Sequence, residues 1–543
     1  MHKRSERSTG AQQAVRRNGR LCLLLITRED SMKHIRKVLV ANRGEIAIRA
    51  FRACRELGIR TVAIYSKEDI LSLHRNRADE AYLVGAGDKP VDAYLDIEDI
   101  IRICKEHNVD AVHPGYGFLA ENAKLAQRCE EEGITFIGPH VEHLIMFGDK
   151  VNARIQAEKA GIPMIPGTKG AVHDFSEVKE FAEKCGLPVM IKAVNGGGGR
   201  GMRNVDRMED LEEAYNRARS EAKMAFGDDE VYVEKCIMNP KHIEVQILGD
   251  EHGHVVHLFE RDCSIQRRHQ KVIEMAPAWS LPQSLRDKIN EAAVKLMKNV
   301  NYVNAGTVEF LVDQDEKHFY FIEVNPRVQV EHTVTEMITD IDIVKTQILI
   351  AEGYSLESPE IGIGKQSEIW FKGVAIQCRI TTEDPQNNFM PDTGKIIAYR
   401  SGGGPGIRLD AGTAYTGAVI TPYYDSLLVK VTAHSLHAKD TIHKMLRCLD
   451  EFRISGVKTN IYFLQNMLRT RDFQEGLCDV NYIDRNPWLL QEPDTVSDRG
   501  TRLLTYIGDI TVNGYAGAGH QDKPDFAPVP VLDASHETAP PAP

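Results

Sequence analysis

The sequence LPVMIKAVNGGGGRGM, from Leu187 to Met202, places a run of glycines directly after a short apolar segment. Residues Leu187 to Ile191 predict a buried strand that ends in Lys192. In the glycines that follow, backbone without side chains can turn sharply and bring its N–H groups close to an anion. The stretch therefore predicts a flexible flap over nucleotide phosphates. A surface linker is the alternative, since the spacing matches neither GxGxxG nor GxxxxGK[ST].

Composition narrows the class of protein. A chain of 543 residues has room for roughly three to four domains, and 42% apolar with 27% charged residues is ordinary for a soluble protein with a large core. The net charge of −11 argues against a nucleic-acid partner, and no apolar run approaches the roughly 20 residues of a membrane span. Ten scattered cysteines without a CxxC pair predict reduced thiols and a cytoplasmic location.

The first part of the chain has two sections of different character. Residues 1–31 are rich in Lys and Arg, and we expect a disordered extension without a structural role, with Met32 as a natural start. The alternative is a transit peptide, which would imply the mitochondrial matrix. From Lys37 to Ile137, strand and helix patterns alternate. This alternation predicts a parallel α/β sheet with ligand-facing loops at the carboxyl ends of its strands.

A pair of acidic residues is the strongest feature of the sequence. The two apolar runs that flank DQDEKH predict a β-hairpin, in which Glu309 faces Glu323 and Leu311 faces Phe321. Directly opposed carboxylates repel each other, and a divalent cation removes this conflict. Mg²⁺, or Mn²⁺ in its place, binds carboxylates together with substrate phosphates, and Asn325 adds an amide oxygen on the same face. The alternative is a solvated pair on an exposed hairpin.

Polar side chains continue beyond the hairpin. In an extended segment, Arg327, Gln329 and Glu331 share one face. A guanidinium, an amide and a carboxylate beside a metal suit a small planar anion such as bicarbonate, and Glu331 could take its proton. Read as structure alone, the segment is a polar strand edge. The cationic run Gln266 to Lys271 is either a surface patch or a pocket wall that complements anions.

Five motifs resemble the biotin carboxylase family of the ATP-grasp superfamily: KVLVANRGEIAIR, HPGYGFLAEN, KAVNGGGGRGM, RDCSIQRRHQKVIE and FIEVNPRVQVEHTVTEM. The likeness runs from about Arg36 to about Asn486, and the motifs, with PDTGKI at Pro391 to Ile396, are most similar to the pyruvate carboxylase branch. The resemblance implies a multidomain α/β and α+β protein. Its parts are an N-terminal parallel α/β (pre-ATP-grasp) domain, an ATP-grasp domain with a mobile glycine-rich lid, and a β-rich C-terminal domain.

The resemblance also implies domain boundaries. They are 1–31 for the extension, 32–146 for the N-terminal domain, 147–365 for the ATP-grasp domain with its lid at about 165–235, 366–486 for the C-terminal domain, 487–514 for the start of an allosteric linker, and 515–543 for a Pro/Ala-rich linker. The linker expectation rests on TRLLTYIGDITVNG, from Thr501 to Gly514, which resembles the segment that follows biotin carboxylase in pyruvate carboxylase.

Site residues are carried over position by position. The family's ATP contacts fall on Lys150, Lys192, Gly196, Gly197, Gly198, Gly199, Glu234, Lys235, His242, Gln266 and His269. Its metal ligands fall on Glu309, Glu323 and Asn325. Its bicarbonate contacts fall on Lys271, Arg327, Gln329 and the backbone of Val330, with Glu331 as base and Arg379 as the residue that stabilises the biotin enolate. The roles of His242, Gln266 and Arg379 come from the resemblance alone.

The implied reaction uses ATP and bicarbonate to carboxylate biotin by way of carboxyphosphate, with Mg²⁺ or Mn²⁺ as cofactor. The sequence contains no Ala-Met-Lys-Met biotinylation motif. We therefore expect the biotinyl carrier and the carboxyltransferase to be domains or chains outside this sequence, and we expect a homo-oligomer. One alternative is a biotin carboxylase subunit of an acyl-CoA carboxylase. Others are a different ATP-grasp ligase, of the carbamoyl-phosphate type, and a non-enzymatic nucleotide-binding module.

Overall fold

The computed structural model describes residues 32–85, 87, 89–168, 170–194, 202–492 and 499–513. The expected extension at 1–31, the glycines from Gly196 to Gly199 and the linker at 515–543 lie outside these residues. The chain divides into two units, with the division after Gln491. Within the described ranges, none of the helices has the length and apolar character that a membrane crossing requires.

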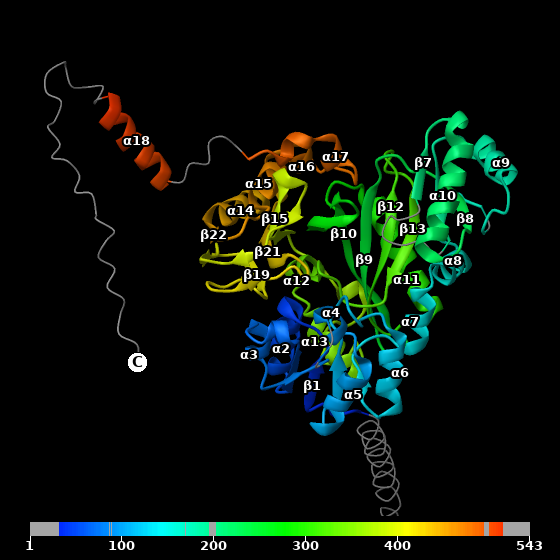
Figure 1. Cartoon of the computed structure of the whole chain (residues 1–543). Helices are drawn as coiled ribbons and strands as arrows, with labels where there is room; N and C mark the ends of the chain where they lie inside the picture. Colours follow the sequence, from blue (N-terminus) through cyan, green and yellow to red (C-terminus); the bar gives the residue numbers. More distant parts are fainter. Residues whose placement is uncertain are drawn as a thin grey trace, which may run out of the picture. The chain divides into compact units, whose positions relative to one another are not determined.

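The N-terminal part is organised by β1 (Lys37–Val40), whose last three residues are buried. This strand lies at the centre of a parallel sheet of order β3-β2-β1-β4-β5, drawn in blue and cyan in Figure 1. The other elements are α2 (Gly44–Glu56), β2 (Arg60–Tyr65), α3 (Leu73–Arg77), β3 (Glu80–Leu83), α4 (Pro90–Ala93), α5 (Ile97–Glu106), β4 (Ala111–His113), α6 (Ala123–Glu131) and β5 (Thr135–Phe136). The predicted parallel α/β fold is confirmed here.

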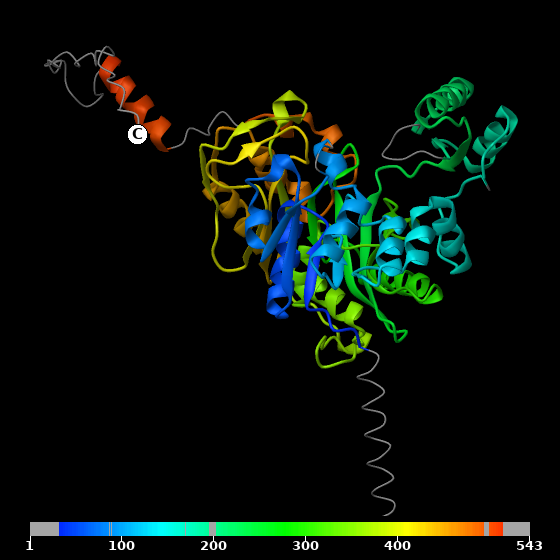
Figure 2. The same ribbon diagram turned by 60° about the horizontal axis from the view of Figure 1, so that its bottom comes forward.

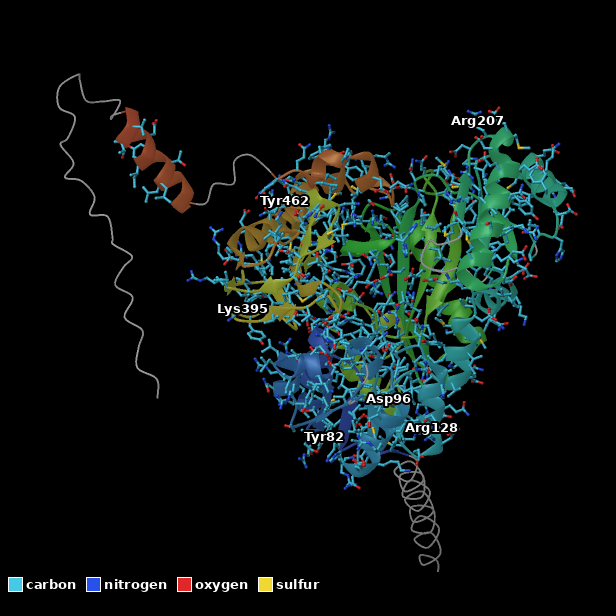
Figure 3. All side chains as sticks on the ribbon, in the orientation of Figure 1. Tyr82, Asp96, Arg128, Arg207, Lys395 and Tyr462 are labelled. Carbon is cyan, nitrogen blue, oxygen red and sulfur yellow. The ribbon has the colours of Figure 1, made fainter. Side chains whose placement is uncertain are left out.

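Polar side chains cap the amino ends of two of these helices. Asp96, labelled in Figure 3, caps α5 by accepting a hydrogen bond from the backbone of Asp99. Asn122 caps α6 in the same way through Lys124 and Leu125. Such caps satisfy N–H groups that have no partner within the helix, so each helix begins at a defined residue.

A single eight-stranded antiparallel sheet forms the middle of the first unit, with strand order β13-β12-β9-β10-β11-β14-β21-β19. Its strands are β9 (Lys241–Gly249), β10 (Val255–Arg267), β11 (Gln270–Ala276), β12 (Asn304–Val312), β13 (Phe319–Asn325), β14 (Val374–Thr381), β19 (Ile407–Ala411) and β21 (Leu427–Ser435). Because β11 pairs with β14, this sheet continues across the domain boundary predicted at 365 and 366. Residues from both sides of that boundary can therefore share one face.

A smaller subdomain within the first unit forms most of the predicted lid. Three antiparallel strands, in the order β7-β6-β8, pack with two helices around a core of their own, which contains Val189, Leu211 and Val233. Their bounds are α9 (Phe175–Cys185), β6 (Val189–Ala193), β7 (Met202–Val205), α10 (Leu211–Phe226) and β8 (Val231–Lys235). Figure 2 shows these elements set apart from the eight-stranded sheet. The connection to the N-terminal part runs through α7 (Val141–Gly148) and α8 (Lys150–Lys159).

Helices complete the first unit. They are α11 (Gln283–Asn299), α12 (His332–Thr339), α13 (Ile343–Glu352), α14 (Ala438–Glu451), α15 (Ile461–Arg469), α16 (Arg471–Glu475) and α17 (Tyr482–Arg485). The apolar sides of α14 and α15 pack on β14 and β21, where Ile376, Val431, Met445 and Phe463 share one core. The second unit contains α18 (Arg499–Asn513), which exposes Leu504 and Val512.

Candidate active site

A row of charged side chains crosses four adjacent strands of the large sheet. Glu309 on β12 lies directly opposite Glu323 on β13, as predicted, and its other neighbour on β9 is Glu244. Glu244 in turn lies opposite Arg261 on β10. Residues that are opposed in register point to the same face of the sheet, so the row brings three carboxylates to one surface.

The predicted pairing of Leu311 with Phe321 is wrong. Leu311 pairs with Tyr320, and Phe321 pairs with Phe310, because the register shifts by one residue between Glu309 and Phe310. This β-bulge lets the aromatic rings of Phe310 and Phe321 both enter the core, where they lie edge to face. A symmetric turn predicts the acidic pair and the pairs farther from the turn correctly, but the bulge displaces every pair nearer the turn.

Lys271 is the cation at the centre of this site. Its Nζ lies 2.9 Å from Glu309 Oε1 and 2.7 Å from Glu331 Oε1, and it also contacts Glu244. Burial lowers the pKa of Lys271, but the three carboxylates more than offset this and hold the pKa well above its ordinary value. The lysine therefore stays charged, and it draws together acids from three separate segments.

Glu331 receives a second cation from the C-terminal strands. Arg379 Nη2 on β14 lies 3.1 Å from Glu331 Oε2, and Arg379 Nε donates a 2.6 Å hydrogen bond to Glu274 Oε1. Burial raises the pKa of Glu331, but Lys271 and Arg379 overcome this and hold the pKa well below its ordinary value. Glu331 is therefore a carboxylate over the whole physiological range of pH.

The segment from Arg327 to Glu331 is not extended, contrary to the prediction. It bends into α12, which begins at the residue after Glu331. Gln329 turns inward, where its Nε2 donates to Glu309 Oε1 at 2.8 Å and its Oε1 accepts from Arg261 Nη2 at 2.8 Å. The bend separates side chains that a strand would place on one face, because turn residues no longer alternate with a period of two.

The side chain of Arg327 has different partners from that of Gln329. Its Nη2 donates a 3.0 Å hydrogen bond to Asn325 Oδ1, and its Nε lies 3.1 Å from Glu121 Oε1 of the N-terminal part. Asn325 Nδ2 donates to Glu309 Oε1 at 2.8 Å. Lys271 and Gln329 thus contact the Glu309 carboxylate directly, whereas Arg327 approaches it through Asn325.

The donor set suits a hard divalent cation. Burial and the neighbouring Glu309 carboxylate raise the pKa of Glu323, because two acids at one place resist ionising together. Glu323 Oε2 lies 3.7 Å from Lys150 Nζ. In the described part of the chain, convergent groups of possible metal ligands include His242 with Glu244 and Glu309, and Glu244 with Cys263 and Glu331. Carboxylate and amide oxygens are the ligands that Mg²⁺ prefers, so Glu309, Glu323 and Asn325 have the right chemistry for this ion.

Two of the predicted ATP residues meet in the lid unit. Lys192 Nζ on β6 lies 2.6 Å from Glu234 Oε2 on β8, and the other oxygen of Glu234 contacts Arg154 of α8. The Glu234 side chain is only 1% exposed, so its charge is offset by two cations rather than by water. Arg154 thereby connects α8 to the strands that carry the predicted phosphate-binding lysine.

The other predicted ATP residues divide into two groups. His242 Nε2 lies 2.7 Å from Glu309 Oε2, and Gln266 Nε2 lies 2.8 Å from His242 Nδ1, so both adjoin the acidic row. Lys235 and His269 are exposed, and His269 occupies the tip of the β10–β11 hairpin, where its φ is +64°. The glycines from Gly196 to Gly199 lie outside the described residues.

Sequence reasoning missed four charged residues of this region, namely Arg154, Glu244, Arg261 and Glu274. A signal existed for Glu244, because His242, Glu244 and Gln246 alternate with Ile243 and Val245, which is the pattern of a strand with one polar face. Arg154 and Glu274 have uncharged neighbours in the sequence and Arg261 lies between Glu260 and Asp262, so no local pattern singles out these three. Only the order of strands in the sheet brings them to the site.

Comparison with known proteins identifies the family. Family models described as biotin carboxylase N-terminal domain, carbamoyl-phosphate synthase L chain ATP-binding domain, and biotin carboxylase C-terminal domain match residues 34–144, 149–359 and 377–485. The biotin carboxylase domain dimer of Hydrogenobacter thermophilus 2-oxoglutarate carboxylase, solved with MgADP, ADP and bicarbonate, is 46% identical. The match covers 85% of this chain and all of that one, with a TM-score of 0.79. The chain belongs to the biotin carboxylase family.

As a biotin carboxylase, the chain is an ATP-dependent ligase, and its similarity extends to longer enzymes. Pyruvate carboxylase of Bacillus subtilis (strain 168) is 65% identical over 496 residues, which are 91% of this chain and 43% of that protein. The structure of Rhizobium etli pyruvate carboxylase with the activator acetyl coenzyme A is 50% identical, with a TM-score of 0.80, and the match covers 93% of this chain and 45% of that one. The chain thus spans less than half the length of these relatives, and it matches their biotin carboxylase portion.

Proposed function

We propose that this biotin carboxylase catalyses the first half-reaction of pyruvate carboxylase, in which bicarbonate carboxylates biotin at the expense of ATP. The observation that carries the proposal is the position of Lys271, whose ammonium lies between Glu309 and Glu331. An anion that enters there meets a buried cation on one side and a carboxylate able to accept a proton on the other. The similarity to a domain solved with MgADP and bicarbonate supports the same substrates.

The bicarbonate site would be formed by Lys271, Arg327, Gln329 and the backbone of Val330. Glu331 would take the proton of bicarbonate, which raises the nucleophilicity of the oxygen that attacks the γ-phosphoryl group of ATP. The products of this step are carboxyphosphate and ADP. Lys271 and Arg379 hold the pKa of Glu331 low. A bound anion would offset both cations, so the same carboxylate becomes a stronger base when bicarbonate is present.

The second step would transfer the carboxyl group to a ureido nitrogen of biotin and release phosphate. Arg379 would stabilise the negative charge that develops on the ureido oxygen, because its guanidinium is held in place by Glu274 and Glu331. Both acids are buried, so the guanidinium is oriented before biotin arrives. Such preorganisation is worth most in a site from which water is excluded.

ATP would be held by Lys150, Lys192, Gly196, Gly197, Gly198, Gly199, Glu234, Lys235, His242, Gln266 and His269. Glu309, Glu323 and Asn325 would hold Mg²⁺ or Mn²⁺, which when bound offsets charge on the transferring phosphoryl group. The raised pKa of Glu323 supports this assignment, since a cation removes the cost of ionising it beside Glu309. Closure of the glycine-rich flap would keep water from the hydrolysable carboxyphosphate.

The complete reaction would convert pyruvate to oxaloacetate. It would need a biotinyl carrier and a carboxyltransferase, as domains or chains beyond those described. The pyruvate carboxylase relatives, which extend well beyond the matched portion, support this reading. Residues 487–514, which include α18, would begin the allosteric linker. The dimer solved for the Hydrogenobacter thermophilus domain supports a homo-oligomer, and we propose a cytoplasmic location.

A biotin carboxylase subunit of an acyl-CoA carboxylase is the alternative. Purification of the native complex distinguishes the two, because a partner with pyruvate carboxyltransferase activity supports our proposal and an acyl-CoA carboxyltransferase contradicts it. The half-reaction itself is tested by ADP release from MgATP with free biotin. We expect release to require bicarbonate and to increase with biotin. Release that is independent of bicarbonate would contradict the proposed function.

A further inference from the structure

Lys430 is a charged residue that the proposed mechanism does not use. It lies in the middle of β21, and its side chain is completely buried. Burial of an ammonium group is costly unless strong partners surround it, and an apolar side chain of similar length would pack at this position without that cost. The partners of Lys430 therefore indicate what the charge does.

The Lys430 ammonium has two close polar partners, and it also lies 5.7 Å from the centroid of the Tyr116 ring. Its Nζ donates a 2.9 Å hydrogen bond to the carbonyl oxygen of Val330 and lies 3.1 Å from Glu45 Oε1 on α2. Val330 precedes Glu331, and its carbonyl belongs to the peptide plane that joins these two residues. The orientation of that plane decides where the Glu331 side chain begins, so Lys430 holds the backbone from which the proposed base projects.

The neighbouring strand holds the side chain of Glu331. Lys430 on β21 lies directly opposite Arg379 on β14, and Arg379 contacts the Glu331 carboxylate. The next pair on this face of the sheet is Thr432 opposite Gln377, and both contact the hydroxyl of Thr333. Two successive cross-strand pairs of β14 and β21 thus contact the turn from Val330 to Thr333.

We infer that Lys430 is a positioning residue for the bicarbonate site, which acts by fixing the Val330–Glu331 peptide rather than by touching substrate. The inference rests on the proposed function, because it assigns Lys430 to the site at which bicarbonate would bind. The inference also assigns a second structural role to strands β14 and β21. Besides presenting Arg379, these strands set the geometry of a turn that belongs to the preceding part of the chain.

The test replaces Lys430 without leaving a buried charge alone. Lys430→Met by itself leaves Glu45 buried and unpaired, so the double variant Lys430→Met/Glu45→Gln, which removes both charges, is the one to measure. Lys444→Met is the matched control, because Lys444 Nζ also donates to a backbone carbonyl, that of His434 at 2.6 Å, away from the anion site. Steady-state ADP release with free biotin gives kcat and KM for bicarbonate and for ATP.

We expect kcat/KM for bicarbonate to fall about 10- to 100-fold in the double variant, because a small displacement of a reacting group slows a reaction by about this much. The KM for ATP should stay within about twofold of its value in the unmutated chain. In Lys444→Met, both the KM for ATP and the kcat/KM for bicarbonate should stay within about twofold. A comparable rise in the KM for ATP, or no loss in kcat/KM for bicarbonate, would overturn the inference and leave the proposed function intact. Failure of the unmutated chain to require bicarbonate would instead overturn the proposed function.

Discussion

Glu309 and Glu323 lie directly opposite each other on β12 and β13, and the pKa values of their carboxyl groups are shifted in opposite directions. Burial raises the pKa of both, but Lys271 and His242 reverse this for Glu309 and hold its pKa well below the ordinary value. Lys150, whose Nζ lies 3.7 Å from Glu323 Oε2, lowers the pKa of Glu323 by less than burial and the charge on Glu309 raise it. Glu309 is thus ready to bind a cation, and ionisation of Glu323 beside it costs free energy that a bound cation would offset.

Removal of the Glu323 carboxylate should have opposite effects with and without metal. Because its folded-state pKa is raised, ionisation of Glu323 destabilises the metal-free protein as pH rises through that pKa. We therefore expect Glu323→Gln to raise Tm at neutral pH in EDTA, to abolish most of the stabilisation by Mg²⁺, and to lower kcat about 100-fold or more. Calorimetric scans with EDTA or MgCl₂, with Glu291→Gln on the exposed side of α11 as control, test this. An unchanged response to Mg²⁺ would remove Glu323 from the metal site.

Mg²⁺ affinity itself should depend on pH. Since the ion binds the ionised form of Glu323, affinity should fall as pH decreases toward the raised pKa, and it should begin to fall above the ordinary glutamate value of 4.5. Titration calorimetry of MgADP binding across this range measures the effect. In Glu323→Gln the remaining dependence should shift to lower pH, where Glu309 ionises. A wild-type affinity that stays constant down to pH 4.5 would contradict the raised pKa.

Loss of the base should leave nucleotide binding in place. Glu331→Gln keeps the shape of the side chain but cannot accept the proton of bicarbonate, so kcat for biotin carboxylation should fall by about 10²- to 10⁴-fold. MgADP affinity should stay within about twofold, because Glu331 contacts Lys271 and Arg379 rather than the predicted nucleotide residues. Glu357→Gln, at an exposed position, is the control. Retention of more than a tenth of the wild-type kcat would exclude Glu331 as the base.

Stability in acid should depend on the same carboxylate. The pKa of Glu331 is lowered in the folded state, so its ion pairs stabilise the fold above the ordinary glutamate value of 4.5, and this contribution is lost as pH falls toward the lowered pKa. We expect the free energy of unfolding, measured in urea, to decrease between pH 5 and pH 3 less steeply in Glu331→Gln than in the wild type. Identical slopes would contradict this.

Arg379 should affect the biotin step more than ATP cleavage. Arg379→Lys keeps a charge beside Glu274 and Glu331 but loses the planar fork that orients the group. We expect biotin-dependent carboxylation to fall about 10- to 100-fold, while the slow bicarbonate-dependent ADP release without biotin stays within about threefold. Arg453→Lys, at an exposed position of the same part of the chain, controls for the substitution. Equal losses in both assays would show that Arg379 is not specific to biotin.

Arg154 should affect the use of ATP. It shares the Glu234 carboxylate with Lys192, so in Arg154→Met the buried carboxylate retains only the lysine and holds it more firmly. Release of Lys192 to a phosphate then becomes harder, and we expect KM for ATP to rise about 10-fold with KM for bicarbonate unchanged. The control is Arg217→Met, which breaks only an exposed pair with Glu213 on α10. An unchanged KM for ATP would show that Lys192 does not depend on Arg154.

Local sequence patterns predicted much of the site, and specific events in the chain explain the errors. The alternation along β12 and β13 placed Glu309 opposite Glu323 correctly, because the period of two is a property of each strand. The pairing of Leu311 failed because a bulge forms where Phe310 and Phe321 enter the core. The extended reading of Arg327 to Glu331 failed because α12 begins directly after Glu331 and the chain bends to enter it.

The amino-acid sequence alone determined the chemistry of the site, since strand periodicity and motif order decide which acids, lysines and arginines are present and which way each strand presents them. Tertiary structure alone decided which of them meet. The sheet places β9 beside β12 and β14 beside β21, so Glu244 joins Glu309, and Lys430 joins Arg379 beneath Glu331. Strand neighbours are selected by the packing of distant apolar faces into common cores, and no local pattern records that selection.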